Sequence, residues 1–176
     1  MSAWQGLKAV GPAEVGLALI TGDETPEEII ILAYGMEEGL RAFYSEMASQ
    51  GRDQEVGGLF GRLSGIEVKH KEKLFELYKT FEEDVPDTET FEKRVIPKVM
   101  EGGVTVEEFL EMNKPALQTV PDVINVSMTI EAQALDLYLR YSVNSEDEKT
   151  KKVLYGIAEE EKAHLRLLGN LLDKKV

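Results

Sequence analysis

The chain of 176 residues contains no cysteine. It therefore forms no disulfide, iron–sulfur centre or thiolate zinc site, and any metal must be held by oxygen atoms and imidazole nitrogens. The longest uncharged N-terminal stretch, residues 15–20, is too short to span a bilayer and lacks the basic flank of a signal peptide. These absences leave hard or borderline metals as candidates, and we expect no membrane partner and a cytoplasmic location.

Positive charge is in short supply, because 20 Lys and Arg face 33 Asp and Glu, for a formal net charge of -13. A field of that sign repels nucleic acid and anionic membranes, so neither is expected as a partner. A cation or a neutral small molecule is the easier ligand. The 43% of hydrophobic residues suits one domain with a real core.

Capping signals and apolar stripes predict an all-α fold. Residues 1–24 show no sustained period and are interpreted as an arm or linker, which leaves residues 25–176 as the domain. We predict four long helices, the first opened by Thr25 and a first-turn proline and the last by a capping box of Ser145 with Glu148. Their expected ranges are 26–49, 53–83, 121–143 and 145–174. Residues 84–120 read as a crossover with short helices near 88–100 and 105–114, so two antiparallel hairpins form a four-helix bundle.

The two histidines of the chain each follow a glutamate by three residues, in Glu67-x-x-His70 and Glu161-x-x-His164. Residues three apart share one face of a helix, so carboxylate and imidazole can reach an ion on the same side. Both pairs lie within the apolar stripe of their helix and therefore face the predicted core. The spacing indicates a metal site.

A further glutamate stands 30 residues before each motif, Glu37 and Glu131, and a tyrosine follows each of these by seven residues, Tyr44 and Tyr138. The sequence midpoints between the paired glutamates fall at the two predicted turns. In an antiparallel hairpin the paired glutamates then meet at one level, about 15 residues or roughly 22 Å from the turn. The chain thus repeats a ligand-bearing helix pair at an offset of 94 residues.

Four buried carboxylates without partners would lose several kcal/mol or more of hydration each, on the order of the cost of any isolated buried ion. Two divalent cations match the charge of four ionised glutamates, and two neutral histidines complete the shell. Helix bundles build dinuclear centres from one Glu on each of two helices and Glu-x-x-His on the other two. We therefore predict six metal ligands: Glu37, Glu67, His70, Glu131, Glu161 and His164.

Simpler readings exist for each residue. The histidines could be satisfied core residues, although two of them in register with four glutamates favour metal. Glu38 competes with Glu37, whose place in the stripe and seven-residue step to Tyr44 favour it. The two tyrosines could be core aromatics with a hydroxyl near the surface.

Taken together, these motifs resemble the rubrerythrin-like branch of the ferritin-like superfamily over residues 25–174. The resemblance rests on Met36-Glu37-Glu38-Gly39 with Phe43-Tyr44, Glu67-Val68-Lys69-His70, Glu131-Ala132-Gln133-Ala134 with Tyr138, and Ala158-Glu159-Glu160-Glu161-Lys162-Ala163-His164. It implies two iron ions, or manganese, or one of each, with no haem, iron–sulfur cluster or flavin. It also implies that Tyr44 and Tyr138 hydrogen-bond the ligands, that hydrogen peroxide is reduced, and that the protein is a homodimer.

The sequence departs from that family at two points. Rubrerythrins carry a second glutamate three residues after the one on the third helix, where this chain has Ala134, so the ligand set is symmetric and the ligand exchange of the family's redox cycle is not expected. The rubredoxin-like domain needs four cysteines and is missing, so electrons must come from a separate protein such as a rubredoxin.

A second resemblance lies in Met1-Ser2-Ala3-Trp4-Gln5-Gly6, which is similar to the closing segment of a rhodanese domain. It implies that the chain is the ferritin-like part of a rhodanese fusion, or a descendant of one.

Three functions follow from these patterns. The first is a dinuclear iron oxidoreductase that reduces hydrogen peroxide. The second is a ferroxidase or iron-handling protein in which O₂ or peroxide oxidises ferrous iron. The third is a non-catalytic bundle stabilised by metal.

Overall fold

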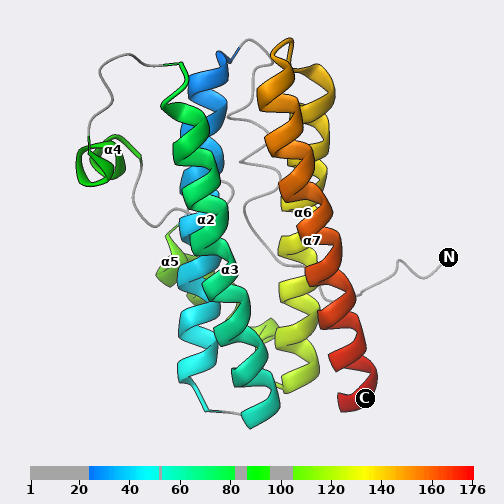
Figure 1. Cartoon of the computed structure of the whole chain (residues 1–176). Coiled ribbons are helices and arrows are strands. Elements are labelled where there is room, and N and C mark those ends of the chain that lie inside the picture. The colour runs from blue at the N-terminus through cyan, green and yellow to red at the C-terminus, as the bar shows by residue number, and fades with distance from the viewer. Residues whose placement is uncertain (1–23, 52, 82–86, 96–104) are drawn as a thin grey trace, which may run out of the picture.

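The computed structural model describes residues 24–51, 53–81, 87–95 and 105–176. Four long helices form an antiparallel bundle, with α2 (Pro26–Ser49) and α3 (Gln54–Tyr78) as one hairpin and α6 (Val120–Asn144) and α7 (Glu148–Lys175) as the other (Figure 1). The described residues contain no strand. The predicted all-α bundle of two hairpins is confirmed, with the crossover between them. The predicted arm, residues 1–24, and its rhodanese-like segment lie outside the described residues except for Glu24.

Local capping explains where the first hairpin begins and turns. Thr25 accepts a hydrogen bond from the backbone of Glu28, whose side chain accepts one from the backbone of Thr25, so two of the unpaired amides of α2 are satisfied. Gly51 takes a φ of 62°, which glycine adopts without strain, and Asp53 then caps α3 by accepting from the amides of Glu55 and Val56. The predicted start and end of α2 are confirmed.

Two predicted boundaries of the long helices were wrong. α3 ends at Tyr78 and not near residue 83, because the amide and hydroxyl of Thr80 both donate to the Leu77 carbonyl and tighten the chain into a turn. α7 is capped by Asp147, which accepts from the Thr150 amide, and not by a Ser145 capping box. Ser145 instead ends α6 by donating its amide to the carbonyl of Tyr141.

The crossover contributes the short helices α4 (Thr88–Arg94), α5 (Val106–Asn113) and the 3-10 turn η2 (Lys114–Ala116). α4 is shorter than its predicted range, and residues 96–100 of that range lie outside the described residues. The Thr105 and Glu108 capping box predicted for α5 is present. α5 packs on α2 through an edge-to-face contact of Phe109 with Phe43, whose ring centroids lie 5.8 Å apart.

Helix α4 is attached to the first hairpin by one aromatic side chain and one polar one. Phe91 is fully buried, with its ring centroid 4.9 Å from that of Tyr34 and 4.6 Å from that of Tyr78. The Tyr34 hydroxyl donates to Glu92 at 2.7 Å, and Lys71 lies 3.1 Å from the same carboxylate. These contacts fix α4 against α2 and α3.

The interior of the bundle is a continuous apolar core interrupted at one level. Above and below that level, the stripes of α3 and α7 supply residues such as Leu63, Leu74, Leu154 and Leu168, all fully buried. The same stripes carry Glu-x-x-His at the interruption, as the periodicity predicts. Among the described helices, none has an apolar run of the length that a bilayer span requires.

We expect Phe91→Ala to lower the free energy of unfolding by about 3 kcal/mol or more, because it removes a buried aromatic ring that holds α4. Urea denaturation measures this. Lys93→Ala is the matched control on the same helix, since its side chain is 71% exposed and its ion pair with Glu89 is a surface one. A loss below about 1 kcal/mol for Phe91→Ala, the size of an ordinary surface substitution, would show that α4 adds little to the fold.

Candidate metal centre

Four helices bring six titratable side chains together at the middle of the bundle. α2 supplies Glu37, α3 supplies Glu67 and His70, α6 supplies Glu131, and α7 supplies Glu161 and His164. The four glutamates and His70 are fully buried, and His164 is 2% exposed. The equal height expected from the sequence midpoints is therefore the arrangement that the fold produces.

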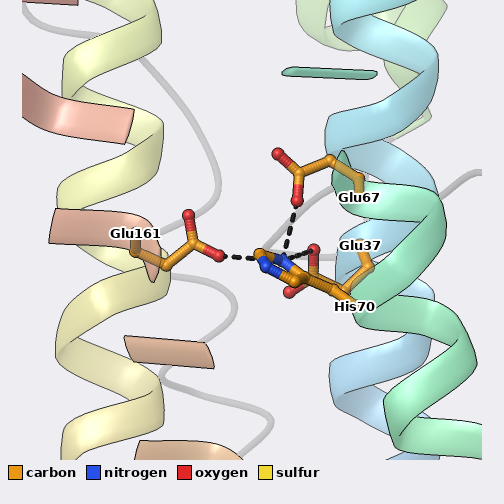
Figure 2. A group of neighbouring side chains, drawn as sticks. All are labelled: Glu37, Glu67, His70 and Glu161. Atoms are coloured by element: carbon orange, nitrogen blue, oxygen red, sulfur yellow. Dashed lines mark hydrogen bonds and ion pairs between the residues drawn. The ribbon is translucent and has the colours of Figure 1, made fainter. Parts of the chain in front are cut away.

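Around His70, three carboxylates from three helices converge on one ring nitrogen (Figure 2). Its Nδ1 atom lies 3.2 Å from Glu37 Oε2, 2.9 Å from Glu67 Oε2 and 3.2 Å from Glu161 Oε1. One ligand atom from each of these four residues falls within 4.8 Å of the others. This group could hold one metal ion.

Around His164 the arrangement repeats. Its Nδ1 atom lies 3.4 Å from Glu131 Oε2, 2.8 Å from Glu161 Oε2 and 3.6 Å from Glu67 Oε1. These four residues also present ligand atoms within 4.8 Å of one another. The two imidazole rings are stacked with centroids 5.7 Å apart, so the two groups are adjacent.

Glu67 and Glu161 belong to both groups. Glu67 turns Oε2 to His70 and Oε1 to His164, while Glu161 turns Oε1 to His70 and Oε2 to His164. A carboxylate with one oxygen toward each of two ion positions is placed to bridge them. Sequence reasoning did not separate these two glutamates from Glu37 and Glu131.

Glu37 and Glu131 each serve one group and are held by a tyrosine from the opposite hairpin. Tyr138 of α6 donates its hydroxyl to Glu37 Oε1, and Tyr44 of α2 donates to Glu131 Oε1. Each glutamate is thereby left with Oε2 facing the nearest histidine. Both tyrosines are fully buried, so the alternative of a hydroxyl near the surface was wrong.

The oxygens of the two glutamates that face both histidines test whether a metal fits. All four oxygens of Glu67 and Glu161 are buried, and none has a hydrogen-bond partner among the described residues. The histidine nitrogens approach them closely, but without the alignment of a hydrogen bond. Buried carboxylate oxygens without donors are costly, and cations coordinated by O and N ligands satisfy them. The donor set therefore fits two divalent ions.

Without metal, protons must limit the buried charge. Burial and the neighbouring carboxylates raise the pKa of Glu67 well above its usual value. Burial and the neighbouring Glu161 carboxyl raise the pKa of Glu131 to about 8. Burial opposes ionisation of Glu161 as well, but its close approach to Glu131, His164 and His70 lowers its pKa below the usual range. These three carboxyl groups are thus protonated or ionised according to their neighbours.

The histidines carry the compensating positive charge in that state. Burial alone would lower the pKa of His70, but the negative charge of Glu37 and its contacts with Glu161 and Glu67 raise it far above the usual range. Burial likewise opposes the His164 cation, and Glu131 and Glu161 raise its pKa to about 11. A divalent ion would displace these protons, because histidine coordinates as the neutral ring.

The structure brings all six predicted ligands together with both predicted tyrosines. Metal binding by these residues stays a prediction. Ala134 is buried one turn after Glu131 and offers no side-chain oxygen to the cluster. Sequence reasoning missed Glu160, whose carboxylate lies 2.9 Å from His70 Nε2. In the sequence, Glu160 is marked only by its place next to Glu161, and the exposed Glu159 belongs to the same run of glutamates.

Comparison with known proteins gives one family and one fold neighbour. The family model described as rubrerythrin matches residues 28–172. A hypothetical protein from Pyrococcus furiosus has a similar structure, with a TM-score of 0.64 and 20% identity over 93% of this chain and 94% of that one. At that identity the likeness shows the fold alone. No curated protein matches the chain.

We expect the metal-free protein to lose stability as the pH rises from 5 to 9. Folded Glu131 keeps its proton up to about pH 8, and folded His164 keeps its own up to about pH 11, whereas in the unfolded chain both are lost near the ordinary values of 4.5 and 6.5. Between these pKa values the folded state binds more protons than the unfolded chain. For each extra proton, the free energy of unfolding falls by about 1.4 kcal/mol for every unit that the pH rises.

Urea denaturation of the chelator-treated protein at pH 6 and pH 8.5 measures this slope. The Glu131→Gln side chain does not titrate, so this variant should show a weaker dependence of stability on pH. Stability that rises with pH over this range would contradict the assigned protonation states.

Proposed function

Because the chain belongs to the rubrerythrin family, we propose that its buried Glu and His cluster holds two iron ions and that the protein reduces hydrogen peroxide. Manganese, or one ion of each metal, could occupy the same oxygen and nitrogen ligands. The observation that carries this proposal is the placement of Glu67 and Glu161, each with one oxygen toward each histidine. A single-ion site has no use for two such carboxylates.

When bound, two ferrous ions supply two electrons, and with two protons these cleave the O–O bond of hydrogen peroxide to give two molecules of water. The chain's own residues contribute position, charge and exclusion of water. Glu37 and Glu131 are fixed from the opposite hairpin by Tyr138 and Tyr44, so each keeps one oxygen directed inward. Such outer hydrogen bonds orient ligands and hold their affinity.

Burial restricts what can react. No ligand side chain is more than 2% exposed, so a small oxidant such as hydrogen peroxide or O₂ is the substrate that fits. The 176 residues contain no cysteine that could hold an iron centre of the rubredoxin type, so we propose that a separate protein such as a rubredoxin returns the electrons. A homodimer and a cytoplasmic location stay predictions.

Iron content and reaction with oxidants test the function. We expect two iron ions per chain after anaerobic loading, and stopped-flow mixing of the diferrous protein should give much faster oxidation by hydrogen peroxide than by O₂. Tens of iron ions per chain would indicate storage instead. Faster reaction with O₂ would favour a ferroxidase, and inertness to both oxidants would defeat the proposal.

A matched pair of variants separates catalysis from a structural metal. Glu67→Ala should lose iron from both positions, because Glu67 faces both, while the apolar core keeps the bundle folded. Glu72→Ala on the same helix is exposed and should behave as the unmodified protein. Circular dichroism after chelation checks the fold. Unfolding of Glu67→Ala would support a metal-stabilised, non-catalytic bundle.

The crossed tyrosines yield a separate prediction. Tyr44→Phe and Tyr138→Phe each remove the donor to one buried carboxylate, and we expect each to weaken iron binding or slow the peroxide reaction by about tenfold or more. Tyr155→Phe is the control, because that ring is 53% exposed on α7. Rates and affinities equal to those of the control would show that the phenols only pack.

A further inference from the structure

The two histidines differ on the side that faces away from the carboxylate cluster. His70 Nε2 lies 2.9 Å from Glu160 Oε2, so the ring is held from both sides. Glu160 comes from α7, across the interface from the α3 helix that carries His70. Its other oxygen pairs with Lys73 of α3, and its side chain is 44% exposed. Glu160 and Lys73 thus link His70 to the surface of the bundle.

The repeat shows what is missing on the other side. At the offset of 94 residues, Glu160 corresponds to Ile66 and Lys73 corresponds to Leu167. Both counterparts are apolar, and Ile66 packs against the core. Among the described residues, no hydrogen bond is made to Nε2 of His164. The two halves of the centre are alike in their six ligands and unlike in what supports the histidines.

The consequence follows from imidazole chemistry. A neutral imidazole has one N–H donor and one lone pair, and the partner of the donor decides which nitrogen keeps the lone pair. Glu160 lies where it accepts from Nε2–H of His70, so once the ring is neutral its Nδ1 lone pair would face the side of Glu37, Glu67 and Glu161, where an ion would bind. His164 has no such acceptor among the residues that the structure describes, so its tautomer and ring orientation would be fixed only when an ion binds.

We propose that Glu160 is a positioning residue that makes the two metal positions unequal, so that the position beside His70 fills first and binds more tightly. This inference rests on the proposed metal centre but not on the proposed reaction. A carboxylate behind a ligating histidine typically changes metal affinity by about 10- to 100-fold, which sets the expected difference between the two positions.

The chain offers a direct readout, because it contains two histidines and each belongs to one position. We would titrate the metal-free protein with Zn²⁺, which is diamagnetic and takes O and N ligands, and follow both imidazoles by ¹⁵N NMR. With less than one Zn²⁺ per chain, the His70 ring should become metal-bound before the His164 ring, with a protected proton on Nε2. Simultaneous binding by both rings, or His164 first, would overturn the inference.

Glu160→Ala should weaken Zn²⁺ binding at His70 by about 10- to 100-fold, remove the protected Nε2 proton and abolish the order of filling. Glu159→Ala is a close control, since its side chain is 46% exposed and it pairs with Lys162. Glu159→Ala should keep the order. Ile66→Glu places a carboxylate at the position that corresponds to Glu160 in the repeat, and it should narrow the difference in Zn²⁺ affinity between the two positions.

The possible failures are distinguishable. If neither ring responds to Zn²⁺, the proposed centre fails and this inference fails with it. If both rings bind Zn²⁺ equally in the unmodified protein and in Glu160→Ala, the centre stands and the inequality is refuted. Because Glu160 is partly exposed, its replacement leaves the core unchanged, and circular dichroism checks that the variant is folded.

Discussion

Negative charge at the centre of an apolar bundle is the constraint on which the rest of this structure depends. Four carboxylates lie at one level, fully removed from water, and their mutual repulsion must be balanced by cations or protons. The two tyrosines that donate across the hairpins, the two histidines and the placement of all six side chains at one level all help to balance that charge. Such a core can hold either divalent ions or protons, because both compete for the same oxygen and nitrogen atoms.

Much of this arrangement is local enough to be read from the sequence. The Thr25 capping box sets the start of α2, and hairpin geometry then fixes which residues of two antiparallel helices meet. Glu37 and Glu67 face each other because their midpoint lies in the turn. Where local signals compete, sequence reasoning fails: Ser145 and Asp147 can both cap a helix, and the choice depends on how α6 ends.

The roles of individual carboxylates were not predictable for a different reason. Glu67 faces both histidines and Glu37 faces only His70, although both are buried glutamates in the same layer. Side-chain rotamers and the position of Tyr138 across the bundle decide which oxygen points where. Glu159 and Glu160 are likewise adjacent glutamates whose side chains are exposed to a similar degree. The rotation of α7 against α3 brings one of them to a histidine, and that is a tertiary property.

The crossed hydrogen bonds make each hairpin incomplete without the other. Tyr44 of the first hairpin donates a hydrogen bond to Glu131 of the second, and Tyr138 of the second hairpin donates one to Glu37 of the first. Two copies of one such hairpin could therefore associate isologously and assemble the whole centre with twofold symmetry. A symmetric dimer of this kind would have to carry the same residue at both copies of every position. Joining the hairpins in one polypeptide removes that requirement, so a residue such as Glu160 can differentiate one half from the other.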